Sequence, residues 1–206
     1  MLSIFFANLW AMSLKEHSYI VVQRVELKQH VDKISDDLTP HSYLDNAAFY
    51  FERDDGAKAS EMIWECSSLQ LKYFLIGNEL DANGDRLRIR IIDFLTTFCT
   101  DKELKDQLFS AWPSVHLSQE NAHDYKFGLG FVKYMLKSAM VFCNVLYEIN
   151  ERKSFNRDDL LNWLPDYLML KVKVPIDGEW KMIEEWIHEG KLKLEGEKPN
   201  MRLIKL

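Results

Sequence analysis

Apolar residues recur at every third or fourth position along most of the chain, which is the spacing of amphipathic helices. This pattern predicts helices over residues 2–16, 24–34, 42–51, 119–151 and 157–164, a short helix or turn at 166–170, and an extended segment at Tyr19–Val22. In the longest of these, 119–151, the central polar residues form one narrow stripe: Lys126, Lys133, Lys137, Asn144 and Glu148. We expect this helix to be buried by the rest of the protein or by a partner chain.

Capping residues and a proline predict the helix boundaries in the middle of the chain. Thr100-Asp-Lys-Glu103 has the form of a capping box, so a helix should start there. Because the residue before a proline disfavours helical geometry, Trp112-Pro113 predicts that this helix ends near Ala111. Ser118 can then cap the long helix.

Residues 57–92 allow two interpretations. The 4-3-4-3 spacing of one long amphipathic helix is met by Met62, Cys66, Leu69, Tyr73 and Ile76. In contrast, residues 86–91 alternate as a half-buried strand does, and residues 69–73 alternate in the same way. We favour a helix at 57–67 followed by a β-hairpin formed by 69–77 and 86–92, and the single long helix stays open as the alternative.

Three arginines give the predicted hairpin a candidate function. On a strand, Arg86, Arg88 and Arg90 would share one face, because alternate residues point the same way. Three parallel guanidinium groups can follow a phosphate backbone or hold an acidic partner. We therefore predict phosphate contact at these positions. A solvated strand face, or a helix on which Arg86 and Arg90 pair with Asp93, is the alternative.

The last 30 residues predict a helix followed by a β-hairpin. Asp177-Gly-Glu-Trp180 is expected to open a helix of about three turns, which Gly190 ends. Two alternating segments, 190–194 and 201–206, are expected to form strands on either side of a polar turn. A short strand is also expected within Lys171–Val174.

The charges on the predicted last helix favour a protein partner over DNA. A helix that reads DNA offers Arg, Lys, Asn or Gln to the bases, whereas this helix presents four glutamates and one lysine. Aromatic anchors beside a polar rim suit a protein interface. We predict protein contact at Trp180, Met182, Trp186 and Ile187, with Trp180, Ile183 and Ile187 on the core face of the helix. In the basic hairpin we predict phosphate contact at Lys191, Lys193 and Arg202.

Composition narrows the class of function. The 206 residues carry a net charge of −6, which argues against extensive nucleic-acid-binding surface and still allows a local basic strip. The three cysteines are far apart and have no metal-binding spacing, so we expect reduced thiols in a cytoplasmic protein. The apolar start, Met1–Met12, lacks the basic region of a signal peptide and is too short to span a bilayer. We expect it to be a buried helix, with no membrane contact.

No residue pattern predicts a catalytic or metal site, and we expect no cofactor. The six histidines lack metal-binding spacing. Asp81–Asp85 begins like a calcium loop, but Arg86 and Ile92 occupy the positions that require glycine and glutamate. Gly128-Leu-Gly130 lacks the rest of a phosphate loop. The acidic pairs at 36–37, 54–55 and 158–159 fall in predicted turns or helix starts, where acids cap backbone amides.

The helix and hairpin within residues 155–206 resemble the end of a winged-helix domain, chiefly through the segments 190–194 and 201–206. With a degenerate second copy in residues 2–92, the layout looks like the tandem winged-helix subunits that partner kleisins in SMC complexes. It also looks like the small middle components of SMC-like bacterial antiphage systems. This resemblance implies a subunit that regulates an ATPase partner on DNA through protein contacts.

These features predict a mainly α protein with small β-hairpins, an α+β fold. The expected domains are a helical N-terminal body at 1–150 and a winged-helix module at 151–206. We expect a non-catalytic accessory or adaptor subunit of a larger, DNA-associated complex, with a larger protein as its partner and weak DNA contact through the basic hairpin. A stand-alone winged-helix DNA-binding regulator is the first alternative, and a metal-dependent nuclease or hydrolase is the second.

Overall fold

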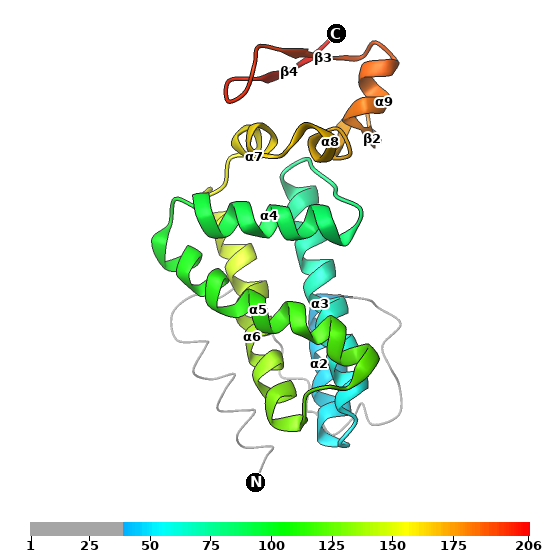
Figure 1. The fold of residues 1–206 in the computed structure, drawn as a ribbon, viewed down its shortest axis with the longest axis vertical. Helices are drawn as coiled ribbons and strands as arrows, with labels where there is room; N and C mark the ends of the chain where they lie inside the picture. Colours follow the sequence, from blue (N-terminus) through cyan, green and yellow to red (C-terminus); the bar gives the residue numbers. More distant parts are fainter. Residues whose placement is uncertain (1–38) are drawn as a thin grey trace. The chain divides into compact units, whose positions relative to one another are not determined.

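The computed structural model of the protein describes residues 39–206 (Figure 1). The segments predicted at 2–16, Tyr19–Val22 and 24–34 lie outside the described residues. The described chain is mainly helical with small antiparallel hairpins, as the sequence predicts. Of the two hairpins near the C-terminus, the sequence predicts the second but not the first. In chain order the first elements are α2 (Pro40–Glu52), α3 (Gly56–Gly77), α4 (Asp85–Phe98), α5 (Lys102–Asp124) and α6 (Leu129–Glu151). They are followed by α7 (Arg157–Trp163), α8 (Asp166–Met169), β1 (Lys173–Ile176), β2 (Glu179–Met182), α9 (Ile183–His188), β3 (Leu192–Glu195) and β4 (Arg202–Lys205).

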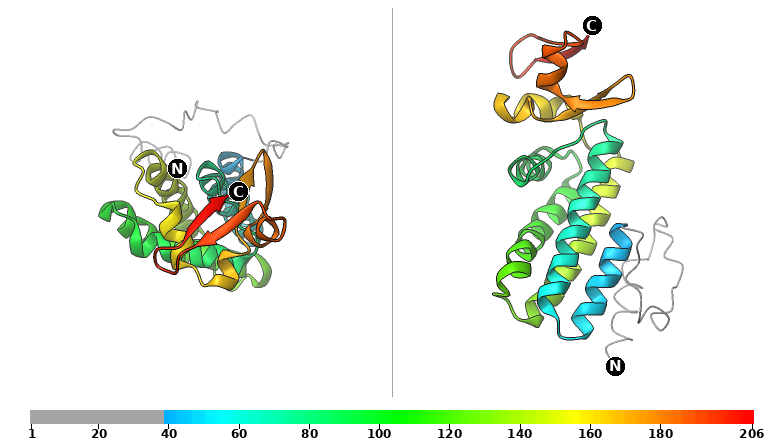
Figure 2. Two further views of the ribbon diagram at one scale, coloured as in Figure 1. Left: turned by 90° about the horizontal axis from the view of Figure 1, so that it is seen from above. Right: turned by 90° about the vertical axis from the view of Figure 1, so that its right-hand side faces the viewer.

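The helical body is built around α3. This helix packs against α2, α5 and α6, and α5 also packs against α6; Figure 2 shows these four helices alongside one another. Their shared core contains fully buried side chains such as Ile63, Leu75, Leu108, Met135 and Phe142. Burial of such large apolar side chains is the main force that stabilises a helical body of this kind.

Polar side chains begin several of these helices. Asp101 Oδ1 accepts hydrogen bonds from the backbone N–H groups of Glu103 (3.0 Å) and Leu104 (3.2 Å). Asn156 Oδ1 accepts from the N–H groups of Asp158 (2.9 Å) and Asp159 (3.2 Å) and caps the start of α7. The capping side chain in residues 100–103 is therefore Asp101 and not Thr100. The acidic pairs at 54–55 and 158–159 lie in a turn and at a helix start as predicted, and the pair at 36–37 lies outside the described residues.

The hairpin predicted from 69–77 and 86–92 is wrong. Residues 69–77 continue α3, and residues 86–92 belong to α4. The buried side chains of α4 have helical spacing: Leu87, Ile91, Ile92, Phe94 and Leu95. The alternation of residues 86–91 fits a strand, but adjacent apolar residues at 91–92 and 94–95 would fall on both faces of that strand. The hairpin of the degenerate winged helix expected in residues 2–92 is therefore absent from the described chain.

The boundaries predicted between residues 111 and 129 are also wrong. Helix α5 continues through Pro113 to Asp124 and includes Ser118, so the long buried helix covers Leu129–Glu151 instead of 119–151. A proline removes one helical hydrogen bond, but Leu108, Ala111 and Val115 around it are all buried, and this burial stabilises the continuous helix.

The turn between α5 and α6 is held by one buried side chain. Asn121 Oδ1 accepts from the N–H of Phe127 at 2.7 Å, and Asn121 Nδ2 donates to Ser60 Oγ of α3 at 2.8 Å. Tyr125 adopts the left-handed conformation with φ 43°. Two hydrogen bonds from one buried amide therefore fix where the chain reverses, and nothing in the local pattern of apolar residues indicates this.

Helix α6 is long and apolar enough to cross a membrane, with a mean hydropathy of 1.3 over its most apolar stretch. Half of that stretch is buried inside the fold, where α6 packs against α3 and α5. Its buried side chains include Val132, Leu136 and Leu146. In the described part of the chain, α6 therefore serves as a core helix of the body, as the narrow polar stripe predicts.

The chain after α6 consists of α7, α8, α9 and the hairpins β1–β2 and β3–β4, and we call this part the terminal module. It belongs to the same compact unit as the described helical body. Two backbone hydrogen bonds of 2.9 Å between Asp81 and Lys173 join β1 to the loop before α4. An ion pair of 2.7 Å between Arg157 Nη1 and Glu79 Oε2 adds a second link to the helical body. Asp81, in the loop between α3 and α4, therefore attaches β1 to the helical body.

Candidate protein interface

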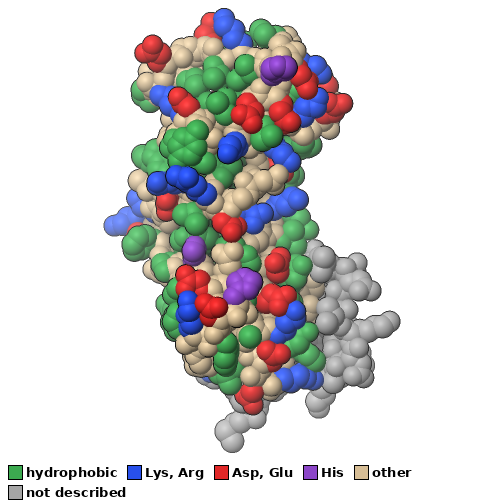
Figure 3. All heavy atoms as spheres, turned by 45° about the vertical axis from the view of Figure 1, so that its right-hand side comes forward, with side chains coloured by type: hydrophobic (Ala, Val, Ile, Leu, Met, Phe, Trp, Pro, Cys, Tyr) green, Lys and Arg blue, Asp and Glu red, His purple; other side chains and the backbone are tan. Residues whose placement is uncertain are grey.

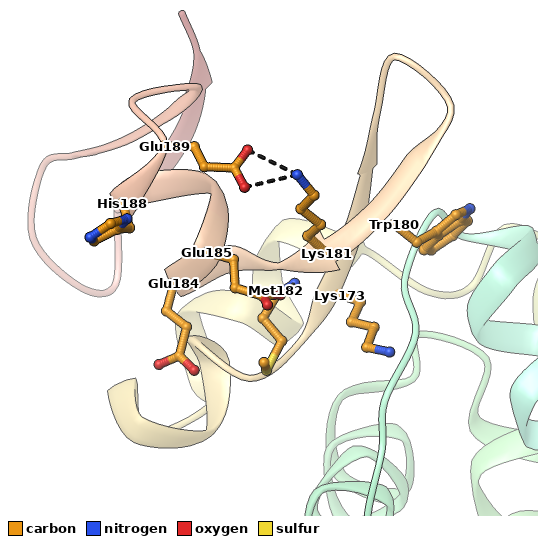
Figure 4. Close-up of a pocket in the computed structure, with 8 residues that line it drawn as sticks. All are labelled: Lys173, Trp180, Lys181, Met182, Glu184, Glu185, His188 and Glu189. Atoms are coloured by element: carbon orange, nitrogen blue, oxygen red, sulfur yellow. Dashed lines mark hydrogen bonds and ion pairs between the residues drawn. The ribbon is translucent and has the colours of Figure 1, made fainter.

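An open groove lies where the β1–β2 hairpin meets α9, and its volume is about 730 Å³ (Figure 4). It is lined by Lys173, Trp180, Lys181, Met182, Glu184, Glu185, His188 and Glu189. These residues come from both strands of the hairpin, from the short helix α9 and, for Glu189, from the residue that caps its end. The groove thus joins Trp180 and Met182, two of the predicted interface residues, to charged residues of α9.

The hairpin forms because Asp177-Gly178 is a two-residue turn. Asp177 has φ 51° and Gly178 has φ 87°, and two consecutive positive φ angles are the signature of the turn that favours tight hairpins. Ile176 consequently pairs with Glu179, and Lys173 pairs with Met182. The prediction that Asp177–Trp180 opens the last helix is wrong. Trp180 and Met182 lie on β2, and α9 has only six residues.

Trp186 lies in α9 between the groove residues Glu185 and His188, but it does not line the groove. Its side chain is completely buried, and its Nε1–H donates a hydrogen bond of 2.9 Å to the carbonyl oxygen of Val174. The ammonium groups of Lys181 and Lys191 lie 4.5 Å and 5.0 Å from the centre of its ring, within reach of cation–π attraction. The prediction of Trp186 as an interface residue is wrong, because its ring is buried inside the protein, where it joins α9 to β1. Ile187 is half-buried.

Trp180 and Met182 provide the apolar surface of the groove. Alternate residues of a strand share a face, so these two side chains lie on the same side of β2. Trp180 remains 37% exposed, and Met182 is half-buried. Glu179 and Lys181 alternate with them on the other face of the strand, and the long side chain of Lys181 reaches the groove beside Glu189 (Figure 4).

Acidic groups outnumber basic groups in the groove. Lys181 Nζ contacts Glu189 at 2.8 Å and 3.0 Å and Glu179 at 3.3 Å. The hydrogen bond to Glu189 is the main cause that raises the pKa of Lys181 above its usual value. Glu185 accepts a hydrogen bond of 2.7 Å from the N–H of Met182.

Three charged or titratable side chains of the groove have no such partner. Within residues 39–206, the side chains of Lys173, Glu184 and His188 form neither an ion pair nor a hydrogen bond. They are thus available to groups on another molecule. Figure 3 shows acidic, basic and apolar side chains interspersed over the visible face of this module.

The three arginines predicted to form one row are separated by the geometry of α4. Residues two positions apart on a helix point about 200° apart, so Arg88 does not share a face with Arg86 and Arg90. Arg86 lies over the ring of Tyr167 at 5.3 Å, Arg88 pairs with Asp85 at 3.9 Å, and Arg90 pairs with Asp93 at 3.5 Å. The predicted phosphate-binding row on a strand is therefore wrong, and the expected helical pairing with Asp93 holds for Arg90.

The predicted basic hairpin forms, as β3 and β4. Lys193 pairs with Ile204 and Glu195 pairs with Arg202. Lys193, Glu195 and Arg202 therefore lie on the same face of the hairpin, with Glu195 directly opposite Arg202. Lys193 and Arg202 are exposed and form no ion pair within the described chain. Lys191 instead lies over Trp186.

The charged lining of the groove was missed because the hairpin was missed. Asp-Gly between two short alternating segments, Lys173–Ile176 and Glu179–Met182, is a strong hairpin signal. Treating that turn as a helix start concealed the proximity of Lys173 to Met182 and to the glutamates of α9.

The described residues contain no group of three or more His, Cys, Asp and Glu side chains that could hold a metal ion. Comparison with known proteins adds no relative: no family model, no curated protein and no solved structure matches the chain.

Proposed function

We propose that this protein is a non-catalytic accessory subunit that binds a larger protein through the groove between β1–β2 and α9. The observation that carries this proposal is the combination of an accessible tryptophan and methionine with a charged rim in one groove. Tryptophan and methionine are enriched at protein interfaces, and a polar rim commonly surrounds them.

The two elements that carry the groove are joined by a buried contact. The hydrogen bond from Trp186 to Val174 fixes α9 against β1. A rigid platform reduces the entropy lost on binding, whereas the flexible side chain of Met182 can adjust to the shape of a partner. This arrangement supports binding without any requirement for a chemical step.

The charges indicate the partner segment. Three glutamates, two lysines and one histidine line the groove, and Lys181 is already paired with Glu189. Glu184 is exposed and has no partner within the described chain. We infer a partner segment with an apolar side chain for Trp180 and Met182 and a basic side chain for Glu184, since complementary charges favour correct encounters.

The remaining proposals rest on the resemblance described for residues 155–206. The order α9, β3, β4 supports a winged-helix relationship, although the β1–β2 hairpin between α8 and α9 is an addition to that pattern. By the same resemblance, we propose an SMC-like ATPase as the partner and the cytoplasm as the location. The winged-helix relationship, the ATPase partner and the location rest on this resemblance and are independent of the groove.

Affinity purification of the full chain from its native cells, with quantitative mass spectrometry, tests the interface. The variants are Trp180→Ala and Glu184→Lys, and Phe109→Ala is the control because Phe109 is 69% exposed on α5, outside the groove. We expect one stoichiometric partner that both groove variants lose and the control retains. Retention of that partner by Trp180→Ala and Glu184→Lys would contradict the proposal.

Weak DNA binding by β3–β4 is a second candidate function, favoured by the exposed and unpaired Lys193 and Arg202. Basic side chains of this kind contact phosphates without reading sequence. With two phosphate contacts, the logarithm of the binding constant should fall with that of salt concentration with a slope of about −2. Titration of labelled duplex DNA with Lys193→Glu and Arg202→Glu tests this; no binding of the wild-type protein at low salt excludes it.

A further inference from the structure

A second cavity is lined by residues at the C-terminal ends of α4 and α6 and at the start of α7, and it shares no residue with the groove on α9. Figure 1 shows where these helices lie. Its volume is about 290 Å³, close to the lower limit for sites of small molecules. The lining contains Phe94, Leu95, Phe98 and Phe155 as its apolar part. Its polar and thiol groups come from Cys99, Thr100, Lys153, Ser154, Asn156 and Asp159.

The apolar wall is made of phenyl rings in fixed positions. Phe94 stacks on Phe98 with ring centres 5.1 Å apart, and it meets Phe155 edge to face at 6.2 Å. Trp163 of α7 lies 5.7 Å from Phe94 and supports this cluster from behind. Phe98 is 50% exposed, although Phe94 is buried and Phe155 and Trp163 are half-buried. An aromatic or branched aliphatic group in the cavity would extend this cluster by one more edge or face contact.

Ser154 is a polar lining residue of the cavity. The residue is only 7% exposed, and its hydroxyl has no hydrogen-bond partner within the described chain. Among described side chains, Ser68 Oγ is the one fully enclosed polar atom without a partner, so the Ser154 hydroxyl keeps some accessible surface. A ligand group or water can therefore bond to it.

Two opposite charges border the same cavity. Lys153 and Asp159 both line it and both are exposed, but they are not paired with each other or with another side chain in the described chain. Lys153 holds a left-handed conformation with φ 51°, which is set by the reversal of the chain after α6. The cavity therefore offers a cation, an anion, a hydroxyl and an aromatic wall to one small molecule.

We propose that this cavity binds a small zwitterion with an apolar side chain, of the class of the aromatic and branched aliphatic α-amino acids. The ligand's carboxylate contacts Lys153 and the Ser154 hydroxyl, its ammonium group contacts Asp159, and its side chain packs on Phe94, Phe98 and Phe155. This site is separate from the groove of the proposed function and involves no chemical step.

Isothermal titration calorimetry and amide NMR shifts of the full chain test the proposal with four probes. L-Phenylalanine carries all three features; 3-phenylpropionate lacks the ammonium group, 2-phenylethylamine lacks the carboxylate, and glycine lacks the apolar side chain. We expect saturable binding of L-phenylalanine with a Kd of about 1 mM or tighter. Each of the other three probes should bind at least about tenfold more weakly, because one favourable contact is missing.

Three variants locate the binding and exclude an effect on folding. Ser154→Ala and Asp159→Asn should weaken binding of L-phenylalanine about tenfold, and so should Lys153→Asn, since asparagine tolerates the left-handed conformation. Ser154→Ala should leave the midpoint of thermal unfolding unchanged or raise it, because its hydroxyl has no partner to lose. The proposal is overturned by absence of saturable binding, by equal binding of all four probes, or by binding that all three variants leave unchanged.

Discussion

The indole Nε1–H of Trp186 donates a hydrogen bond of 2.9 Å to the carbonyl oxygen of Val174, and this bond joins α9 to β1. Both residues are buried, so water cannot replace the bond. Six positions earlier in the chain, Trp180 lies on β2 with 37% of its surface exposed. The two tryptophans therefore have separate roles: Trp186 stabilises the groove, and Trp180 presents a surface.

Trp186→Phe should lower the free energy of unfolding by about 2–4 kcal/mol, because it removes a buried hydrogen bond and part of a buried ring. Trp180→Phe should change it by less than about 0.5 kcal/mol, because an exposed ring without a hydrogen bond contributes little. Urea unfolding followed by circular dichroism measures both. Equal losses for the two variants would contradict the separation of roles.

Gly178→Ala should lower the free energy of unfolding by about 1 kcal/mol. Gly178 has φ 87°, and alanine is strained there although no atom lies within 4 Å of the added Cβ. Gly130→Ala is the matched control, since this glycine is in α6 and also has open space around its Cβ. That variant should raise stability by about 0.5–1 kcal/mol. A neutral Gly178→Ala, measured by the same unfolding assay, would speak against the two-residue hairpin turn.

Cys66 should make the protein less stable at alkaline pH. Its Sγ lies 3.5 Å from that of Cys143, and this hydrogen bond, followed by burial, raises the pKa of Cys66 well above its usual value. The thiol therefore ionises first in the unfolded chain, whose cysteine pKa is about 8.5. The stabilisation is complete below that pH and falls as pH rises toward the folded pKa, by up to about 1.4 kcal/mol per pH unit.

Unfolding under reducing conditions at pH 7, 9 and 10 tests the effect of Cys66. Cys66→Ala should show a shallower loss of stability with pH than the wild-type protein, whatever its stability at pH 7. Parallel curves for the two proteins would show that Cys66 does not titrate as argued.

Asp101 should stabilise the protein at neutral pH and lose this effect in acid. The N–H of Leu104 and the guanidinium of Arg152, 2.9 Å from its carboxylate, are the main causes that lower the pKa of Asp101. The stabilisation is present above the unfolded pKa of about 3.9 and is lost as pH falls through the lower folded pKa. Asp101→Asn keeps a capping oxygen and removes the charge, so its deficit in thermal midpoint should shrink between pH 7 and pH 2. A deficit that stays constant with pH would contradict this assignment.

The sequence identified elements best where pattern and local chemistry agree. Gly190, with φ 70°, ends α9 as predicted, because glycine adopts the left-handed conformation that follows a helix. The β3–β4 hairpin was also predicted, because its apolar residues alternate on both sides of a polar turn.

Prediction failed where tertiary packing overrode a local signal. Arg86–Ile91 alternates like a strand over six residues, and burial of Ile91, Ile92 and Leu95 in the helical body decides for α4. Pro113 is a helix breaker by propensity, yet α5 continues through it because residues on either side are buried. The turn at Asn121 depends on Ser60, which is 61 residues away in the chain. Such long-range contacts have no local signature.

The candidate groove could be predicted in part. The apolar character of Trp180 and Met182 beside charged residues predicts them as interface residues. Their position on β2 follows from the Asp177-Gly178 turn, which is itself a recognisable hairpin signal. Trp186 could not be distinguished from them by composition, because exposed and buried tryptophans differ only in what surrounds them.

Site-specific photo-crosslinking in native cells tests the central claim most directly. A benzophenone amino acid replaces Met182, which lines the groove, or Phe109, which is exposed on α5. We predict a single crosslinked protein adduct from position 182, abolished by Glu184→Lys, and no such adduct from position 109. Absence of an adduct at position 182, or the same adduct from both positions, would contradict docking at this groove.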